Sequence, residues 1–527
     1  MALNIQTVLI SESVDPSCAK ILSENGVKVT TKVGLSSEEL KNEIQHYDGL
    51  VVRSATKVTA DILAAGKQLK IVGRAGVGVD NIDCDAATKH GVLVINAPGG
   101  NTLSAAELTC AMIVSLSRNI VEASASLKSG KWDRKKFMAN ELLGKTLAII
   151  GLGRIGREVA HRMQSFGMKT IGFDPLVPAE ESIKFGVESM ELEKIWPLAD
   201  YITVHTPLIP QTRNMINAEV FSKCPKGVKI INCARGGIVN EDDLFTALEA
   251  GQCGGAGLDV YMEEPPKNTK LIQHPKVICT PHLGASTHEA QSRVADEISL
   301  QFVDLISGKP AHGIVNSPAF SLSMADSNKP WVILSKHAGA LAGALFPSSD
   351  KLSLSIKVNG PELNRKESLF SAAALIGILK QRNQVTANFV NAPTLAKENG
   401  YEVSSVELQT PLVESTCPVS LTLTVKSASE THSILVCFKG EQPLLCAIDG
   451  SGFNNPPVLS HNLIVCKGAQ NAIVALLGKL VESGVSSISL SAVSEGKLWC
   501  AIHSSNKCDI FQDNLTKSLD ISAQLSL

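Results

Sequence analysis

The chain has 527 residues, of which 44% are hydrophobic and 19% charged, so it carries enough apolar material for several packed cores. Its 49 basic and 51 acidic residues leave a formal charge of −2, and only 4% of the residues are aromatic. This balance argues against nucleic acid as a partner, since nucleic-acid binders carry a basic excess and stacking aromatics.

The 13 cysteines are scattered and include no Cys-x-x-Cys pair. That spacing argues against a disulfide scaffold or a zinc ribbon, and we predict no metal site. The first residues lack a secretory signal, and no run approaches the about 18 apolar residues of a membrane span. We therefore expect a soluble, cytosolic protein that has no membrane partner.

The first hundred residues alternate between short apolar runs and helical segments. Because the runs are continuous and rich in β-branched residues, they predict parallel strands covered on both faces. We expect these strands at 7–10, 27–29, 49–52, 69–72 and 92–95. A longer helix is expected at 101–119, and the spacing of Ser104 and Glu107 predicts a capping box at its start.

A basic cluster follows this helix, with Arg134 and three lysines between residues 131 and 136. The cluster is either a solvated loop or a clamp for an anionic substrate, bound in its own or in a neighbouring subunit. The sequence leaves both interpretations open.

A second alternating series runs from 144 to 315, with strands expected at 146–150, 169–173, 201–205, 228–232, 255–259 and 277–280. Helices are expected at 156–167 and 286–307. The series predicts a second doubly wound, Rossmann-like parallel sheet, with a cleft between the two.

After residue 315 serine becomes frequent and apolar residues alternate, as at Leu352, Leu354, Ile356 and Val358. A period of two predicts antiparallel sheets with one wet face. From 463 the order is strand, helix, strand, strand and a last helix at 509–520, a small α+β module. We therefore expect four domains: 1–98 completed by 286–314 (substrate binding), 99–285 (dinucleotide binding), 315–458 (an intervening α+β domain) and 459–527.

The residues from Gly151 to Gly156 form a GxGxxG turn that follows a strand and opens a helix, and Asp174 ends the next strand, about 20 residues further on. Gly151 permits the tight turn, Gly153 lets a pyrophosphate approach the backbone, and Gly156 allows close helix–strand packing. Asp174 would accept hydrogen bonds from a ribose diol and repel a 2′-phosphate. The pattern therefore predicts NAD rather than NADP.

Three polar residues follow successive strands of this second half: Arg235, Glu264 and His282. In a parallel sheet they share the edge at which doubly wound folds bind ligands. His282 suits the base that removes a hydroxyl proton, Glu264 would orient its ring, and Arg235 would hold a carboxylate with two bonds. Each residue also has a structural interpretation: a turn residue for Arg235, a solvated loop for Glu264 and a helix cap for His282.

Arg53 and Arg74 end strands of the first half, so they are expected to face the cleft. Two further arginines exceed what a plain 2-hydroxy acid needs and favour a second anionic group, such as a phosphate. We interpret Cys233 and Cys279 as packing thiols, because the sequence places no base beside them.

Four segments together resemble the D-isomer-specific 2-hydroxyacid dehydrogenases: the glycine turn, 232–237, 259–265 and 281–285. The resemblance covers about residues 5–315 and implies that the family's arginine, glutamate and histidine correspond to Arg235, Glu264 and His282. It also implies NAD contacts at Val77, Gly151, Gly153, Arg154, Ile155, Gly156, Asp174, Thr206, Cys233, Ala234, Arg235, Asp259, His282, Leu283, Gly284 and Ala285.

Segments 51–56 and 73–81, with the two further domains, resemble the long animal form of the family branch that oxidises 3-phospho-D-glycerate to 3-phosphohydroxypyruvate at the start of serine synthesis. This implies substrate contacts at Arg53, Arg74, Gly76, Asn101, Arg134, Arg235 and His282, with Arg134 reaching in from a partner subunit. It further implies a homo-oligomer, often a tetramer, and an ACT-like regulatory-type last domain. Side reduction of 2-oxo acids such as 2-oxoglutarate is consistent with the carboxylate grip.

Two alternatives stay open. Within the same enzyme class, the chain could be a reductase of glyoxylate or hydroxypyruvate, against which Arg53 and Arg74 argue only weakly. Outside it, the corepressor-type NAD(H)-sensing binding proteins keep the same arginine, glutamate and histidine. They carry a disordered tail, whereas residues 320–527 of this chain show strand and helix periodicity.

Overall fold

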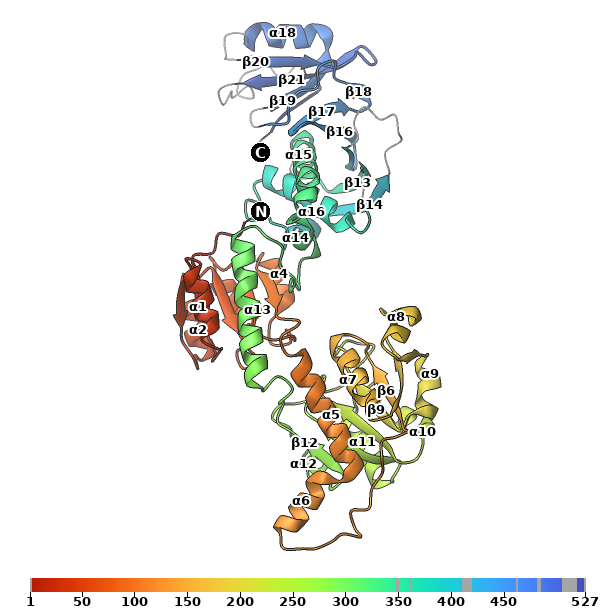
Figure 1. The fold of residues 1–527 in the computed structure, drawn as a ribbon. Helices are drawn as coiled ribbons and strands as arrows, with labels where there is room; N and C mark the ends of the chain where they lie inside the picture. The colour runs from red at the N-terminus through yellow and green to blue at the C-terminus, as the bar shows by residue number, and fades with distance from the viewer. Residues whose placement is uncertain are drawn as a thin grey trace.

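The computed structural model describes residues 2–346, 350–360, 363–409, 419–460, 463–480, 485–504 and 519–525. Their strands form four sheets that follow one another along the chain. In Figure 1 the first sheet lies between the second sheet, below it, and the last two sheets, above it. No helix in these ranges is long and apolar enough to cross a membrane.

The first sheet has five parallel strands in the order β2-β1-β3-β4-β5. Neighbouring residues of β1 enter different cores, Val8 on one face and Leu9 on the other, so the sheet is covered on both faces as predicted. The strands are β1 (Thr7–Ile10), β2 (Lys28–Thr31), β3 (Gly49–Val52), β4 (Ile71–Arg74) and β5 (Leu93–Asn96), and the helices between them are α1 (Ser17–Glu24), α2 (Ser37–Glu43), α3 (Ala60–Ala65) and α4 (Cys84–Lys89).

Helix α13 (His288–Ile306) packs on this first sheet, although the whole second sheet precedes it in sequence. It lies beside α1 (Figure 1). Its Phe302 is buried in the same core as Val8 and Ile71, which joins the helix to the strands. We call β1–β5, α1–α4 and α13 the first lobe.

The second sheet has seven parallel strands in the order β12-β11-β10-β9-β6-β7-β8, and we call it with its helices the second lobe. The chain changes direction across the sheet between β6 and β9, and ligands bind at such switch points. The strands are β6 (Thr146–Ile150), β7 (Lys169–Phe173), β8 (Glu188–Ser189), β9 (Tyr201–Val204), β10 (Val228–Asn232), β11 (Cys253–Leu258) and β12 (Val277–Cys279). The helices are α5 (Thr102–Arg118), α6 (Ile120–Lys128), α7 (Arg154–Gln164), α8 (Ala179–Lys184), α9 (Leu192–Ile195), α10 (Ala218–Lys223), α11 (Glu241–Glu249) and α12 (Thr269–Ile272).

The third sheet is mixed, in the order β14-β13-β15-β16-β17-β18. The expectation of purely antiparallel strands was wrong, because β13 and β14 pair in parallel while the other pairs are antiparallel. The strands are β13 (Leu352–Asn359), β14 (Tyr401–Gln409), β15 (Ser420–Lys426), β16 (Thr431–Lys439), β17 (Gln442–Ile448) and β18 (Ser451–Gly452), and the helices are α14 (Pro318–Ser323), α15 (Lys329–Leu345), α16 (Glu367–Gln381) and α17 (Ala392–Glu398).

The fourth sheet is antiparallel, in the order β20-β21-β19-β22. Its elements are β19 (Leu463–Ala469), α18 (Gln470–Leu480), β20 (Val485–Leu490), β21 (Lys497–Ser504) and β22 (Ile521–Gln524). The helix expected at 509–520 falls almost wholly on 505–518, outside the described residues. The doubly wound parallel sheets and the α+β texture of the C-terminal part are confirmed.

Candidate active site

The glycine turn joins β6 to α7 at the switch point. Gly151 has φ 99°, and a Cβ there would lie 2.5 Å from the carbonyl oxygen of His205, after β9. A Cβ at Gly156 would lie 2.1 Å from the Gly151 carbonyl oxygen, whereas one at Gly153 would meet nothing within 4 Å. Since α7 has no side-chain N-cap, its first N–H groups face the open space at Gly153, as a phosphate-binding turn requires.

Asp174 lies directly beside this turn. One of its carboxylate oxygens accepts a hydrogen bond from the Leu152 amide (2.9 Å) and the other from the Leu176 amide (2.8 Å). Across the switch point, the hydroxyl of Thr206 is buried without a hydrogen-bond partner. An open glycine turn, a fixed carboxylate and an orphaned hydroxyl fit a dinucleotide whose phosphates lie on α7. Arg154 and Ile155 are the first two residues of that helix.

Asp259, after β11, is fully buried and holds the loop that carries His282. Its carboxylate accepts hydrogen bonds from the amides of Leu283 (2.6 Å) and Gly284 (2.8 Å) and from the hydroxyl of Thr280 (2.6 Å). His282 itself has φ 56°, a left-handed conformation that a non-glycine residue adopts only when its surroundings impose it. These bonds at either side of His282 impose it.

His282 and Glu264 are in direct contact: Nδ1 of the imidazole lies 2.8 Å from Oε2 of the carboxylate. The other carboxylate oxygen of Glu264 accepts a hydrogen bond from the Tyr261 amide at 3.2 Å. With Nδ1 facing the carboxylate, the second ring nitrogen, Nε2, is left for a ligand. The His282 side chain is 46% exposed, so a ligand can reach it.

Arg235, after β10, points to the other lobe. Its Nε donates a hydrogen bond to the carboxylate of Asp80 in the loop after β4 (2.9 Å), and its Nη1 donates to the carbonyl oxygen of Ala234 (2.6 Å). Within the described residues no hydrogen bond joins it to Glu264 or His282. The three predicted residues are thus brought together as one contacting pair, with the arginine held separately.

Arg74 is mostly buried, and its Nε has no hydrogen-bond partner. Burial, together with the positive charges of Arg235 and Arg53, lowers the pKa of Arg74 to about 10. Gly76 gives the guanidinium its room, because a Cβ there would lie 1.8 Å from Nη1 of Arg74. Three cations therefore share one region, and a buried donor among them is unsatisfied, as expected of a site for an anion.

Arg53 directly follows β3, in a loop that Glu12 holds in place. The carboxylate of Glu12 accepts hydrogen bonds from the amides of Arg53, Ala55 and Thr56, and Asn81 donates to the carbonyl oxygens of Arg53 (2.7 Å) and Thr56 (2.6 Å). The loop that begins with Arg53 and the loop that follows Arg74 are therefore tied to each other.

The remaining predicted residues lie in three settings. Asn101 precedes α5 with its side-chain oxygen buried and unpartnered, and the carbonyl oxygen of Val77, in the loop after β4, accepts a hydrogen bond from Asn96 (2.6 Å). Cys233 lies against Met112 of α5, and burial raises the pKa of its thiol to about 12, which fits the packing thiol that the sequence predicts. Arg134 is exposed between α6 and β6, and in the described residues no hydrogen bond or ion pair links it to the other predicted site residues.

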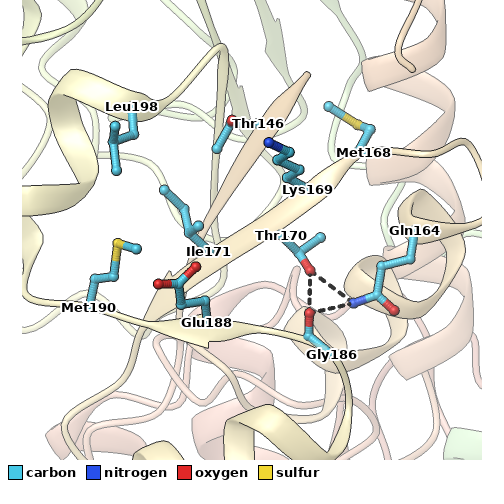
Figure 2. A pocket seen from close by; sticks show the side chains of 10 residues that line it. All are labelled: Thr146, Gln164, Met168, Lys169, Thr170, Ile171, Gly186, Glu188, Met190 and Leu198. Atoms are coloured by element: carbon cyan, nitrogen blue, oxygen red, sulfur yellow. Dashed lines mark hydrogen bonds between the residues drawn. The ribbon is translucent and has the colours of Figure 1, made fainter. Parts of the chain in front are cut away.

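A pocket lies at the N-terminal ends of strands of the second sheet, away from the candidate site, and none of the predicted site residues lines it (Figure 2). It is lined by Thr146 and Lys169, the first residues of β6 and β7, and by Gln164, which bonds to Thr170. Parallel strands bind ligands beyond their C-terminal ends, so this pocket is not the candidate site.

Sequence reasoning missed the residues that hold the site: Glu12, Asp80, Asn81 and Thr280. Asp80 and Asn81 lie in the segment 73–81, which carries the family resemblance. An acidic residue in a segment that also contributes an arginine to the cleft could have indicated that Asp80 pairs with an arginine. Glu12 and Thr280 left no signal, because their partners are backbone amides and a buried carboxylate far along the chain.

Known proteins match almost the whole chain. The D-3-phosphoglycerate dehydrogenase of Homo sapiens is 48% identical over 504 residues, which cover 94% of each chain. The chain belongs to the D-3-phosphoglycerate dehydrogenase family. The enzyme of that name from Bacillus subtilis is 46% identical over 400 residues, 75% of each chain.

Two family descriptions match separate parts. "D-isomer specific 2-hydroxyacid dehydrogenase, NAD binding domain" matches residues 110–284, and "D-3-phosphoglycerate dehydrogenase intervening domain" matches 327–449. The D-lactate dehydrogenase of Aquifex aeolicus, solved with NAD and lactic acid, superimposes with a TM-score of 0.52 at 29% identity, covering 57% of this chain and 96% of its own. The chain is an NAD-dependent dehydrogenase of the D-2-hydroxyacid class, as predicted.

Proposed function

We propose that the chain oxidises 3-phospho-D-glycerate to 3-phosphohydroxypyruvate with NAD, the first step of the phosphorylated route to L-serine, in the cytosol. The observation that supports this substrate most strongly is the cluster of Arg53, Arg74 and Arg235, in which Nε of Arg74 is buried and has no hydrogen-bond partner. One carboxylate needs one arginine, whereas a substrate with a carboxylate and a phosphate needs more. Relatives named D-3-phosphoglycerate dehydrogenase support the same substrate.

In the proposed reaction, Arg235 grips the substrate carboxylate and Nε2 of His282 accepts the proton of the C2 hydroxyl. Glu264, on Nδ1, fixes the orientation of the ring and stabilises the imidazolium that forms. When bound, NAD supplies the acceptor for the hydride that leaves C2, so the alcohol becomes a ketone. Arg53, Arg74, Gly76 and Asn101 hold the phosphate end, and closure of the two lobes excludes water.

The dinucleotide is proposed to lie along α7. Asp174 receives the ribose diol and the glycine turn receives the pyrophosphate. Further contacts are proposed from both lobes, at Val77, Arg154, Ile155, Thr206, Cys233, Ala234, Asp259 and Leu283–Ala285. Both carboxylate oxygens of Asp259 already bind the loop of His282, so its part in this set acts through that loop.

We further propose a homo-oligomer, often a tetramer in this family, in which Arg134 reaches a neighbouring subunit's cleft. The exposure of Arg134 supports this. The four sheets support four domains with the boundaries given above, and α13 in the first core supports the assignment of 286–314 to the first domain.

The test is a substrate panel with purified full-length protein. We expect NAD-dependent oxidation of 3-phospho-D-glycerate and NADH oxidation with 3-phosphohydroxypyruvate, each at a kcat/KM at least tenfold above D-glycerate and unphosphorylated hydroxypyruvate. Equal or better rates with glyoxylate or hydroxypyruvate would replace the proposal by a reductase. No turnover with any of them, together with NADH binding, would favour the nucleotide-sensing alternative.

A further inference from the structure

The acidic group that meets Arg235 comes from the opposite lobe. Asp80 lies in the loop after β4, its side chain is 67% exposed, and its Oδ2 accepts the hydrogen bond of Arg235 Nε at 2.9 Å. Among the described arginines of the second lobe, Arg235 is the only one whose guanidinium donates a hydrogen bond to this loop. Asp80 therefore lies where the two lobes must approach each other to enclose a substrate.

The loop is built to receive the guanidinium. At Gly78, a Cβ would lie 1.8 Å from Nη2 of Arg235 and 2.7 Å from Oδ2 of Asp80, so a side chain there would displace the ion pair from its present position. Asn81, the next residue, ties the loop to the carbonyl oxygens of Arg53 and Thr56. The carboxylate is thus presented from a fixed backbone and not from a free loop.

These bonds leave a defined edge of the arginine available. A guanidinium has five N–H donors, of which Nε is used by Asp80 and one of Nη1 by the Ala234 carbonyl oxygen. Three donors remain, one on Nη1 and two on Nη2, and a substrate carboxylate can accept hydrogen bonds from these. Asp80 thereby determines which edge the substrate meets.

We propose that Asp80 is a positioning residue for the substrate carboxylate: it holds Arg235 so that the Nη1–Nη2 edge faces the C2 end of the bound 2-hydroxy acid. The proposal rests on the proposed function, because it assigns Arg235 to the substrate carboxylate. It goes beyond that function in stating that residues of both lobes together form the binding site for the substrate carboxylate.

A charge effect of Asp80 and a positioning effect of Asp80 predict opposite changes in substrate affinity when the residue is replaced. Through charge alone, loss of an acid beside Arg235 and Arg74 leaves the cations less neutralised and tightens anion binding. Loss of positioning frees the guanidinium and weakens binding, which appears mainly in KM because the contact exists in ground and transition states alike.

The experiment compares Asp80→Ala and Asp80→Asn with the wild type in steady-state oxidation of 3-phospho-D-glycerate and D-glycerate. We expect Asp80→Ala to raise KM about tenfold for both substrates, with kcat changed by less than about threefold, and Asp80→Asn, which keeps an acceptor, to recover part of the loss. Asp85→Ala, which removes an exposed acid in the first turn of α4, is the matched control and should change neither parameter.

A double variant tests whether the effect passes through Arg235. In the Arg235→Met background, Asp80→Ala should cause no further loss, because coupled residues are not additive. An unchanged or lowered KM in Asp80→Ala, or a fully additive loss in the double variant, overturns the inference. If the wild type itself does not oxidise 3-phospho-D-glycerate, the proposed function fails, and the two failures are distinguished.

Discussion

The orientation of one imidazole depends on residues that never touch it. Asp259 binds Thr280 before His282 and the Leu283 and Gly284 amides after it, which holds the intervening residue at φ 56°. The ring then meets Glu264 at 2.8 Å. A buried acid thus organises the backbone, and a half-exposed acid faces the ring.

His282→Ala removes the proposed base. We expect kcat for 3-phospho-D-glycerate oxidation to fall by about 10²–10⁴-fold, the usual contribution of general acid–base catalysis, while NADH affinity measured by fluorescence is retained. Glu264→Gln, which keeps an acceptor for Nδ1 but loses the charge, should lose less than His282→Ala. Near-normal turnover in His282→Ala would contradict the assigned role.

Asp174→Ala tests the choice of dinucleotide. Its carboxylate stands beside the glycine turn, where it favours a diol and repels a 2′-phosphate. We expect the ratio of kcat/KM for NAD to that for NADP to fall by at least tenfold. Gln164→Ala, at the other edge of the sheet, should leave the ratio unchanged, and an unchanged ratio in Asp174→Ala would remove the specificity argument.

At the residue scale, the sequence was sufficient wherever a motif carries its own geometry. The turn from Gly151 to Gly156 was predictable because local spacing reveals its glycines: Gly151 and Gly156 have steric reasons within the chain, and Gly153 borders the open space for a ligand. The pairing of Asp80 with Arg235 was not, since it joins loops of two lobes, and strand ends alone do not say which acid meets which arginine.

Among the elements, the least predictable were those set by tertiary contacts. β13 and β14 lie in parallel because α16 and α17 intervene, and a crossover of that length returns the chain in the same direction. The alternation at Leu352 and Leu354 correctly predicted a half-buried strand, but a period of two carries no information on strand direction.

The capping box predicted at Ser104 and Glu107 was wrong. Helix α5 begins at Thr102 and has no side-chain cap from Asn101. The hydroxyl of Ser104 instead pairs with that of Thr287 at 2.7 Å, and Thr287 caps α13. A tertiary partner displaced the local one that the four-residue pattern suggested.

Helix α15 buries a lysine, which gives a stability prediction. Burial, with repulsion from Lys380, lowers the pKa of Lys336 to about 8, although its ammonium lies 5.0 Å from the centre of the Phe389 ring. Below pH 8 the charge is present in both states and destabilises the fold. Between the folded pKa and the unfolded value of about 10.4, the unfolded chain binds more protons, so stability rises with pH.

Lys336→Met should therefore raise the free energy of unfolding of this part of the chain by roughly 1–3 kcal/mol at pH 7, and the gain should shrink above pH 8 and vanish above about pH 10.5. Urea unfolding followed at pH 7, 9 and 10.5 measures it. Lys380→Met, at an exposed position of α16, removes only the repulsion and leaves Lys336 buried, so it should raise stability by less than about 0.5 kcal/mol. A destabilised Lys336→Met would show that the ring contact outweighs the buried charge.

For the whole molecule, the chain passes between the two lobes at two adjacent points, ahead of α5 and ahead of α13. These segments are fastened together: Arg293 donates to the carbonyl oxygen of Gly100 (3.0 Å), Glu297 accepts from the Gly99 amide, and Ser104 meets Thr287. These hydrogen bonds hold the two connecting segments together. The contact between Asp80 and Arg235 is a separate link between the lobes, formed by other loops of the chain. The substrate is proposed to bind between the lobes and to contact residues of both.

The most direct measurement is a crystal structure of the full chain with NADH and 3-phospho-D-glycerate, a pair that cannot react with each other. The account predicts the substrate between the lobes, its C2 hydroxyl oxygen within about 3.2 Å of Nε2 of His282, its carboxylate on Nη1 and Nη2 of Arg235, and its phosphate on Arg53 and Arg74. A substrate bound elsewhere, or one whose hydroxyl faces away from His282 with the lobes closed on it, would contradict it.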